Sequence, residues 1–476
     1  MKKRLLAIAA AAFLGLTGCT TMAPEYARPA APVPAQWPTI PANQGDTAEG
    51  SAQLVADLHW QDFFADPKLR QLIALGLENN RDLRVAALNI ERSRAQYQIR
   101  RAALFPRLAG VVAGSGQGIP ADLSSTGNAT TIHQYSVGLG VSSYELDLFG
   151  RIRSLKDQAL KQYFATEQVR RSVQISLIGE LANNYLALAA DRERLALAQK
   201  TLANQQEGYR LINSRVAAGV SSVIDLNRAR TSVEAARVDI ARYTNLVARD
   251  ENTLAALLGT PVPVDLLPAA LTDGFYAVNE LSPRLTSAVL LRRPDILQAE
   301  NLLKAANANI GAARAAFFPR ITLVGSFGTG SNELAGLFQA GSRAWSFAPQ
   351  ITVPIFTGGS NQANLEVAKI DREIAVARYE QAIQQAFREV ADALAQKGTI
   401  DAQLAAQQAL TDATAESFRL SQARYDNGAD SYLAVLDSQR TLYAAQQGMI
   451  TTRQTRLNNL ATLYKVLGGG WQEHPQ

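Results

Sequence analysis

The sequence contains few of the residues on which enzyme chemistry usually depends. Its 476 residues include one cysteine and three histidines, and these histidines, His59, His133 and His474, lie far apart. No Cys/His spacing typical of a metal site, no phosphate-binding glycine loop and no G-x-S-x-G motif is present. We therefore expect no enzymatic activity, no cofactor and no bound metal.

Aromatic residues are also sparse, at 7% of the chain, and long segments are rich in Ala, Gln, Leu and Arg. This composition is typical of long, shallowly packed helices and not of one compact core. The net charge of +5 falls to 5 − 3 = +2 without residues 1–18, which hold three cations and no acid. A nearly neutral remainder argues against nucleic acid as a partner.

The N-terminus has the pattern of a secretory signal over residues 1–18. The cations K-K-R precede an apolar stretch, Leu5 to Leu16, that is too short for an ordinary transmembrane helix. The segment L-T-G-C ends at Cys19 and matches the bacterial lipobox. This resemblance implies cleavage before Cys19 and acylation, and Thr20 in place of Asp implies the outer membrane. Several acyl chains give a stable anchor.

Residues 19–60 are predicted to form an extended, lipid-anchored tether. The segment holds six prolines and has no helical or strand periodicity. The only cysteine is consumed by the lipid in this interpretation, so no disulfide or thiol chemistry is expected.

A long unit then occurs twice. The sequence A-A-L-F-P-R at 102–107 recurs as A-A-F-F-P-R at 315–320, a shift of 213 residues. The motif R-L-x-x-x-R-x-x-x-G that begins at Arg210 recurs at Arg419, a shift of 209 residues. Repetition over this length indicates a duplicated supersecondary unit. We assign the first repeat to 61–260 and the second to 283–468, with a linker at 261–282 and a C-terminal tail at 469–476.

Each repeat contains two candidate strands, about 107–148 in the first repeat and about 320–356 in the second. Apolar residues alternate with small polar ones from Tyr135 to Val141, and Ser143 shifts the phase. One apolar face with terminal aromatics and one small, polar face is typical of strands between lipid and a wet lumen. A half-buried hairpin of a soluble protein has the same alternation. The outer-membrane anchor favours the membrane interpretation.

A very long helix pair follows each strand pair. Residues 151–217 contain no proline, and six apolar residues from Leu181 to Val216 fall on strict heptads, the coiled-coil period. At about 1.5 Å per residue, ~65 residues make a rod of roughly 100 Å. The partner helix is expected at about 222–258, and the second repeat gives about 360–426 and 430–467.

Four membrane strands cannot form a finished structure alone. A membrane sheet must close, and bacterial barrels start at eight strands. Eight strands leave an interior filled by side chains, whereas more strands leave a channel. Because the residues on the lumen side are small, the sequence predicts a barrel shared by at least three chains without fixing the number.

Several motifs together resemble the outer membrane factor family. They are the lipobox, the proline-rich tether, W-Q-D-F-F-A-D-P-K-L from Trp60, N-N-R-D-L-R-V-A-A-L-N from Asn79, and the paired F-P-R and R-L-x-x-x-R-x-x-x-G motifs. The match covers nearly the whole mature chain. It is similar to the lipid-anchored drug-efflux branch, with its OprM-type and NodT-type lipoproteins, and more distantly to TolC.

The resemblance implies a mainly α fold with a transmembrane β part. A homotrimer would form a 12-stranded β-barrel, four strands per chain, continued by a long α-helical barrel, with the 261–282 linker in the equatorial region. This outer membrane channel, extending into the periplasm, would be the exit duct of a tripartite efflux pump for small toxic compounds such as antibiotics. Its implied partners are a periplasmic adaptor and an inner-membrane resistance-nodulation-division transporter.

The resemblance also implies a gate where each helix pair turns at the periplasmic end. Asp225 and Tyr425 match positions that hydrogen-bond between neighbouring hairpins and hold the entrance shut. Leu433 and Asp437 match the narrowest ring, and Arg440, one helical turn from Asp437, can pair with it. Acidic rings of this kind favour cations.

The tips of the two turns are the implied adaptor contacts. Gly219 and Gly428 suit the left-handed backbone that ends a helix. The repeated arginines, Arg215 and Arg424 among them, favour a shared role at the tip. The proposed contacts are Gly219, Val220, Ser221, Arg424, Gly428, Ala429 and Asp430.

Two other functions fit the same sequence. One is an exit duct for proteins, as in type I secretion. The other, of a different class, is a periplasmic lipoprotein scaffold in which coiled coils carry soluble hairpins.

Overall fold

The computed structural model describes residues 21–38, 58–277 and 286–471. The predicted signal segment and Cys19 lie outside these residues. The chain divides into two compact units. Unit 1 comprises residues 1–30, 89–167 and 298–379, and unit 2 comprises residues 31–88, 168–297 and 380–476.

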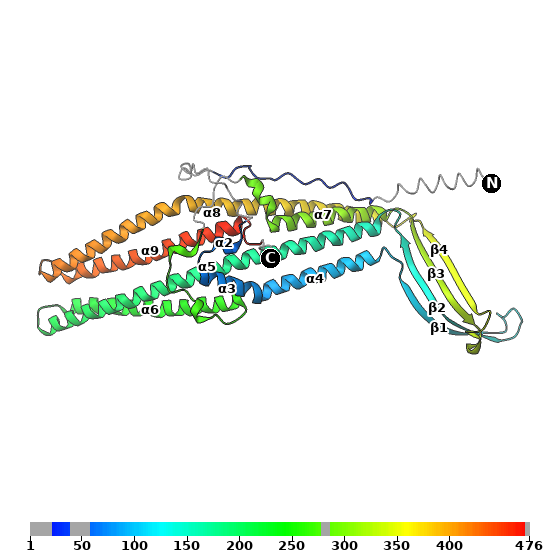
Figure 1. The fold of residues 1–476 in the computed structure, drawn as a ribbon, viewed down its shortest axis with the longest axis horizontal. Helices are drawn as coiled ribbons and strands as arrows, with labels where there is room; N and C mark the ends of the chain where they lie inside the picture. The colour runs from blue at the N-terminus through cyan, green and yellow to red at the C-terminus, as the bar shows by residue number, and fades with distance from the viewer. Residues whose placement is uncertain (1–20, 39–57, 278–285, 472–476) are drawn as a thin grey trace. The chain divides into compact units, whose positions relative to one another are not determined.

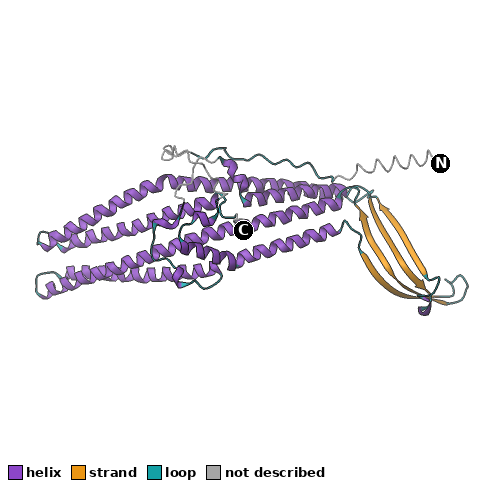
Figure 2. Ribbon diagram, viewed as in Figure 1, coloured by secondary structure: helices purple, strands orange, loops and turns teal. Residues whose placement is uncertain are grey.

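The described residues are mostly helical, with four strands (Figures 1 and 2). In chain order the main elements are α2 (Trp60–Phe63), α3 (Pro67–Asn79), α4 (Arg81–Ala102), β1 (Leu108–Ile119), β2 (Thr130–Leu146), α5 (Arg151–Ala217), α6 (Val223–Leu258), α7 (Pro294–Ala315), β3 (Arg320–Ser331), β4 (Arg343–Thr352), α8 (Ser360–Asp426) and α9 (Tyr432–Val466). Short 3₁₀ turns are η4 (Val264–Leu266), η5 (Asp273–Phe275), η6 (Ser287–Arg292) and η7 (Leu334–Gly336). Over the described ranges, no helix is both long and apolar enough to cross a membrane.

The four strands of unit 1 form one antiparallel sheet in the order β1-β2-β3-β4 (Figure 2). The register of β2 against β3 changes between Val141 and Tyr144, and Ser143 there has a positive φ of 55°. This bulge inserts residues without a partner and re-aims the following side chains. The phase shift predicted at Ser143 is therefore confirmed.

The strand β4 is an edge of this sheet and carries Pro349, opposite Leu323 of β3. Within the chain β4 has one strand neighbour, and the missing N–H of a proline removes at most one hydrogen bond from the ladders of such a strand. The strand ends at Thr352, four residues before the expected limit at 356. Pro354 has no N–H to extend the ladder.

The long helices begin and end close to the residues predicted from the sequence. Both α5 and α8 contain 67 residues. The heptad residues Leu181 and Leu188 of α5 are fully buried. Ser222 caps α6 by accepting a hydrogen bond from the Asp225 backbone N–H, and the helix ends at Gly259 with φ of 70°.

The duplication is visible in how each long hairpin ends in unit 2. Asn80 Nδ2 donates to the Leu257 carbonyl at 2.8 Å, and Arg293 Nη1 donates to the Val466 carbonyl at 2.7 Å. The donors are 293 − 80 = 213 residues apart and the acceptors 466 − 257 = 209, the two shifts of the sequence repeat. Carbonyls at helix ends lack intrahelical partners. Both repeats therefore satisfy the same carbonyl with different side chains.

Four aromatic residues gather in the core of unit 2. Phe63 stacks on Tyr464 with ring centroids 4.1 Å apart, and Phe64 and Tyr276 pack beside them. The Tyr464 hydroxyl donates to the Leu58 carbonyl at 2.7 Å. These rings pack α2 and the segment after η5 against α9 in unit 2.

The described part of the tether has no helix or strand, as expected for its prolines, but it is docked. In unit 1, Arg28 and Tyr26 bond to Glu300, which is 3% exposed. Burial opposes ionisation of Glu300, yet the bonds from Arg28 and Lys304 outweigh it and lower the pKa of this carboxyl. In unit 2, Trp37 stacks on Phe387 at 4.7 Å.

The described part of the predicted C-terminal tail also packs. The Gly470 carbonyl accepts from Gln174 Nε2 at 3.1 Å, and Arg171 lies 4.5 Å over the Trp471 ring. Residues 469–471 therefore extend the fold of unit 2 instead of leaving it.

Candidate functional site at the two helix turns

The turns that join α5 to α6 and α8 to α9 have the same backbone structure. Gly219 and Gly428 have φ of 75° and 74°. The Val220 N–H donates to the Arg215 carbonyl at 2.9 Å, and the Ala429 N–H donates to the Arg424 carbonyl at 2.8 Å. These are Schellman motifs, which need a left-handed residue after the helix. The glycine prediction is confirmed at both turns.

An apolar cluster lies below the two turns and joins the two hairpins of unit 2. It consists of Ile212, Ala229, Tyr425, Tyr432, Val435 and Leu436, with Tyr209, Val216, Leu226 and Phe418 at its margin. The rings of Tyr425 and Tyr432 are 5.3 Å apart, and burial raises the pKa of the Tyr432 hydroxyl to about 12. The cluster holds the turns side by side through apolar contact.

Tyr425 is the most buried of the predicted gate residues, with 8% of its surface exposed. Its hydroxyl accepts a hydrogen bond from Arg215 Nη1 at 2.7 Å, and the Arg215 guanidinium lies 5.1 Å from the ring centroid. The contact joins α5 to α8, 210 residues apart. Arg215 is absent from the predicted gate, although its repetition as Arg424 had marked it as a tip residue.

Asp225 lies in the first turn of α6 and is engaged locally. Its Oδ2 accepts from the Ser222 hydroxyl at 2.7 Å, and its Oδ1 lies 3.7 Å from Arg228 Nη1. Ser222 thus caps α6, and the Asp225 carboxylate accepts from the capping hydroxyl in the first turn, where a negative charge stabilises a helix start. Within the single described chain, Asp225 and Tyr425 are not bonded to each other.

The predicted adaptor contacts line the exposed tips of the turns. Arg424 is bidentate to Asp430 across the second turn, with Nε to Oδ2 at 2.6 Å and Nη2 to Oδ1 at 3.2 Å. The hydrogen bond from Arg424 lowers the pKa of the Asp430 carboxyl. Val220 is 65% exposed, and Gly219, Gly428 and Ala429 are exposed.

Leu433 and Asp437 lie one helical turn apart on the exposed face of α9. Arg440 is also exposed, but among the described residues no ion pair joins it to Asp437, contrary to the pairing suggested by their spacing. Arg440 instead lines a groove of about 260 Å³ between α5, α6 and α9. In this groove the Tyr443 hydroxyl donates to Asp239 at 3.0 Å.

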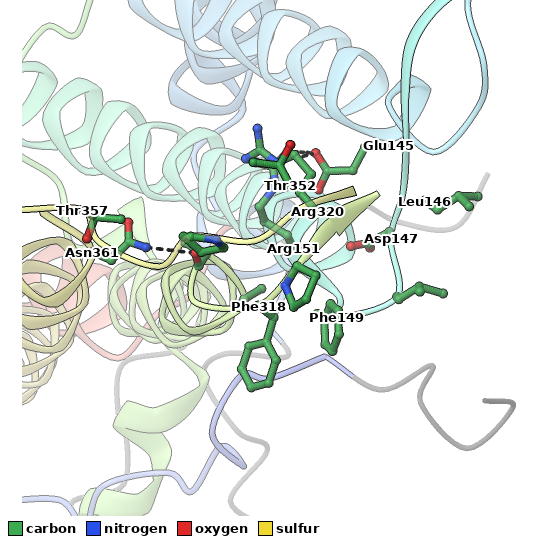
Figure 3. A pocket seen from close by; sticks show the side chains of 15 residues that line it. Glu145, Leu146, Asp147, Phe149, Arg151, Phe318, Arg320, Thr352, Thr357 and Asn361 are labelled. Atoms are coloured by element: carbon green, nitrogen blue, oxygen red, sulfur yellow. Dashed lines mark hydrogen bonds and ion pairs between the residues drawn. The ribbon is translucent and has the colours of Figure 1, made fainter. Parts of the chain in front are cut away.

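A second cavity, of about 280 Å³, lies in unit 1 where the strands meet the helices (Figure 3). Arg151 is bidentate to Glu145 at 2.8 and 2.6 Å, and Arg320 reaches the same carboxylate at 3.3 Å. Phe149 and Phe318 stack at 4.7 Å beside this network. The F-P-R motif of the second repeat thus places Arg320 on Glu145 and joins the sheet to the start of α5.

Neither the groove beside Arg440 nor the cavity beside Arg151 resembles a metal centre. Across residues 21–38, 58–277 and 286–471, no group of three or more His, Cys, Asp or Glu is arranged to hold a metal ion.

Comparison with known proteins matches both repeats to one family. The family model described as outer membrane efflux protein matches residues 72–260 and 285–469. Each matched segment falls on one of the two sequence repeats.

Named relatives cover almost the whole chain. The antibiotic efflux pump outer membrane protein ArpC of Pseudomonas putida is 49% identical over 473 residues, covering 99% of this chain and 97% of the relative. The toluene efflux pump outer membrane protein TtgC, also of Pseudomonas putida, has the same identity and coverage.

Solved structures agree. The open state of the MtrE outer membrane channel of Neisseria gonorrhoeae is 43% identical, with a TM-score of 0.86, covering 95% of this chain and 99% of that one. The repeated turns, the four-stranded sheet and these matches lead to one conclusion: the chain is an efflux protein of the outer membrane and belongs to the outer membrane efflux protein family.

Proposed function

We propose that three copies of this chain form the exit duct of a tripartite efflux pump. The main support is the sheet of unit 1, in which β1 and β4 each have one strand neighbour among the described residues. Two open edges cannot remain unpaired in lipid, so β1 of one chain must pair with β4 of another. Three chains give twelve strands, which leave an open channel where eight would not.

The proposed cargo is small toxic compounds, antibiotics and organic solvents among them. Relatives at 49% identity are named for antibiotic efflux and for toluene efflux. The lumen side of the strands is built from small residues such as Gly138 and Gly140, which leave room for passage. The duct needs no catalytic residues, because the inner-membrane transporter supplies the energy for export.

The proposed partners are a periplasmic adaptor and an inner-membrane resistance-nodulation-division transporter. The exposed tips of the two turns, with Val220 and the Arg424–Asp430 pair, offer a surface of alternating apolar and charged groups for the adaptor. Acylation of Cys19 would fix the mature N-terminus to the outer membrane. Replacing Cys19 and measuring labelled-lipid incorporation tests the anchor.

Assembly provides the first test of the duct. The purified chain should run as a trimer in detergent by mass measurement and should conduct weakly in planar bilayers. A chain that is monomeric, and soluble without detergent once Cys19 is replaced, would instead be a periplasmic scaffold.

The gate has two separate tests. Three copies of Asp437 around one axis would attract cations, so Asp437→Ala should lower the cation preference of the channel, measured as a reversal potential in a salt gradient. An unchanged reversal potential would remove Asp437 from the constriction. The combination Asp225→Ala with Tyr425→Phe should raise conductance if these residues hold the entrance shut.

A further inference from the structure

Two arginines at equivalent positions of the repeat take different partners. Arg215 and Arg424 are 209 residues apart, and their carbonyls accept the same Schellman hydrogen bond. The backbones of the two turns therefore do not explain the difference. It must come from the side chains around each arginine.

The second turn offers Arg424 a carboxylate. Asp430 lies six residues further on, and the bidentate contact folds the guanidinium back over its own turn. Bidentate arginine–carboxylate pairs are the strong, geometrically fixed kind. Arg424 is thereby kept within its own hairpin, although its side chain remains 61% exposed.

The first turn offers Arg215 no such carboxylate. The residue equivalent to Asp430 is Ser221, because 430 − 209 = 221. Arg215 therefore reaches into the other hairpin, where the Tyr425 hydroxyl accepts its hydrogen bond at 2.7 Å. The reverse contact cannot form, because the residue equivalent to Tyr425 is Val216, which has no hydroxyl.

We propose that Arg215 is a gate-positioning residue that ties the two hairpins of each chain together, and that the serine at position 221 keeps it free to do so. The proposal deepens the channel function above and rests on it. The contact exists only while α5 and α8 lie together at their ends, so it favours every state in which the hairpins are together over states in which they separate. Asp225 has a different task, because its carboxylate accepts a hydrogen bond from the Ser222 hydroxyl that caps α6.

The test introduces into the first turn an acid equivalent to Asp430 of the second turn. Ser221→Asp should recapture Arg215 within its own turn, and Arg215→Met should remove the tie directly. A hydrogen bond from a charged donor, half-buried as here, corresponds to roughly a tenfold change in an equilibrium. Each variant should therefore raise the open fraction of single channels in planar bilayers about tenfold. Ser221→Asn, which adds bulk without charge, should give a smaller rise.

A new acid at position 221 would also approach Asp225, whose Oδ2 lies 3.5 Å from the Ser221 hydroxyl. Adding Ser221→Asp to Arg215→Met separates the two effects. If the acid acts by capturing Arg215, the double variant opens no more than Arg215→Met alone. A further rise in the double variant would mean repulsion of Asp225 and would overturn the proposed dependence on position 221.

Arg237 supplies a control on α6. It lies 3.0 Å from Glu234, and both side chains are more than half exposed. Arg237→Met removes the same charge and should leave the open fraction unchanged. All variants should remain trimeric on native gels.

The outcomes separate this inference from the proposed function. If the wild-type chain conducts and Asp437→Ala changes its selectivity, but Arg215→Met and Ser221→Asp leave the open fraction unchanged, the tie is wrong and the duct stands. If no variant and no wild-type trimer conducts, the proposed duct is overturned together with the tie.

Discussion

Replacing Arg28 by alanine removes two of the four polar contacts that hold the buried Glu300 carboxylate. Arg28 supplies Nε to Oε1 at 3.0 Å and Nη2 to Oε2 at 2.8 Å. Lys304 at 2.9 Å and the Tyr26 hydroxyl at 3.1 Å remain. The change therefore weakens the docking of the tether and leaves the carboxylate partly satisfied.

The magnitude follows from the exposure of the two partners. The Glu300 side chain is 4% exposed, but that of Arg28 is 47% exposed, so solvent screens the pair from one side. Hydrogen bonds to charged groups contribute about 1.5–3 kcal/mol when buried, and the lower end applies here. We expect a loss of about 2 kcal/mol in tether docking, which raises the undocked population roughly 30-fold.

Chymotrypsin cleavage after Tyr26 measures this population, because cleavage of a transiently opened segment follows its equilibrium when closing is fast. The rate in folded trimers should rise roughly 30-fold for Arg28→Ala. Glu25→Ala is the matched control, since Glu25 is exposed and has no bonded partner among the described residues. An equal cleavage rate in wild type and Arg28→Ala would refute the argument that this pair docks the tether.

Two further predictions concern the sheet and the long hairpins. Gly328→Ala should prevent assembly of trimers, because its Cβ would lie 2.5 Å from the Gly138 Cα. Gly140→Ala on the inner strand β2, whose Cβ would meet its nearest atom at 3.7 Å, should assemble normally on native gels. Burial raises the pKa of the Asp250 carboxyl from 3.8 to about 6, with the charge of Asp191 adding to the shift. Stability against urea should therefore fall as pH rises from about 4 to about 6, and Asp250→Asn should abolish this dependence.

The sequence predicts the long elements well because local signals specify them. Helix α5 begins after Gly150 and ends before Gly219, with no proline between them. Its predicted heptad residues are fully buried at Leu181 and Leu188 and only partly buried from Leu195 to Val216. The bulge at Ser143 was also predictable, because one residue out of phase moves every later side chain to the other face. These features depend on neighbours in the chain.

The contacts of the candidate site depend on residues far apart and were harder to predict. The tether was predicted to be extended, and its own composition gave no partner for it, whereas Arg28 bonds to Glu300, 272 residues away. At the turns, the family resemblance identified Tyr425 but gave no indication of Arg215 as its partner. The repetition of Arg215 as Arg424 was a usable signal, and the non-repetition of Asp430 was the part that decided the contact.

Helices α5 and α8 have the same length, 67 residues each, and this limits where residues can be inserted in the chain. The repeat shift is 213 residues before the strands and 209 after them, so the four-residue difference lies in the strand hairpins. A loop absorbs added residues at little entropic cost. Within a helix each added residue turns everything beyond it by about 100° and moves it by about 1.5 Å, which would carry Arg215 away from Tyr425. Added residues are therefore tolerated in the strand hairpins, whereas the helices can change length only together.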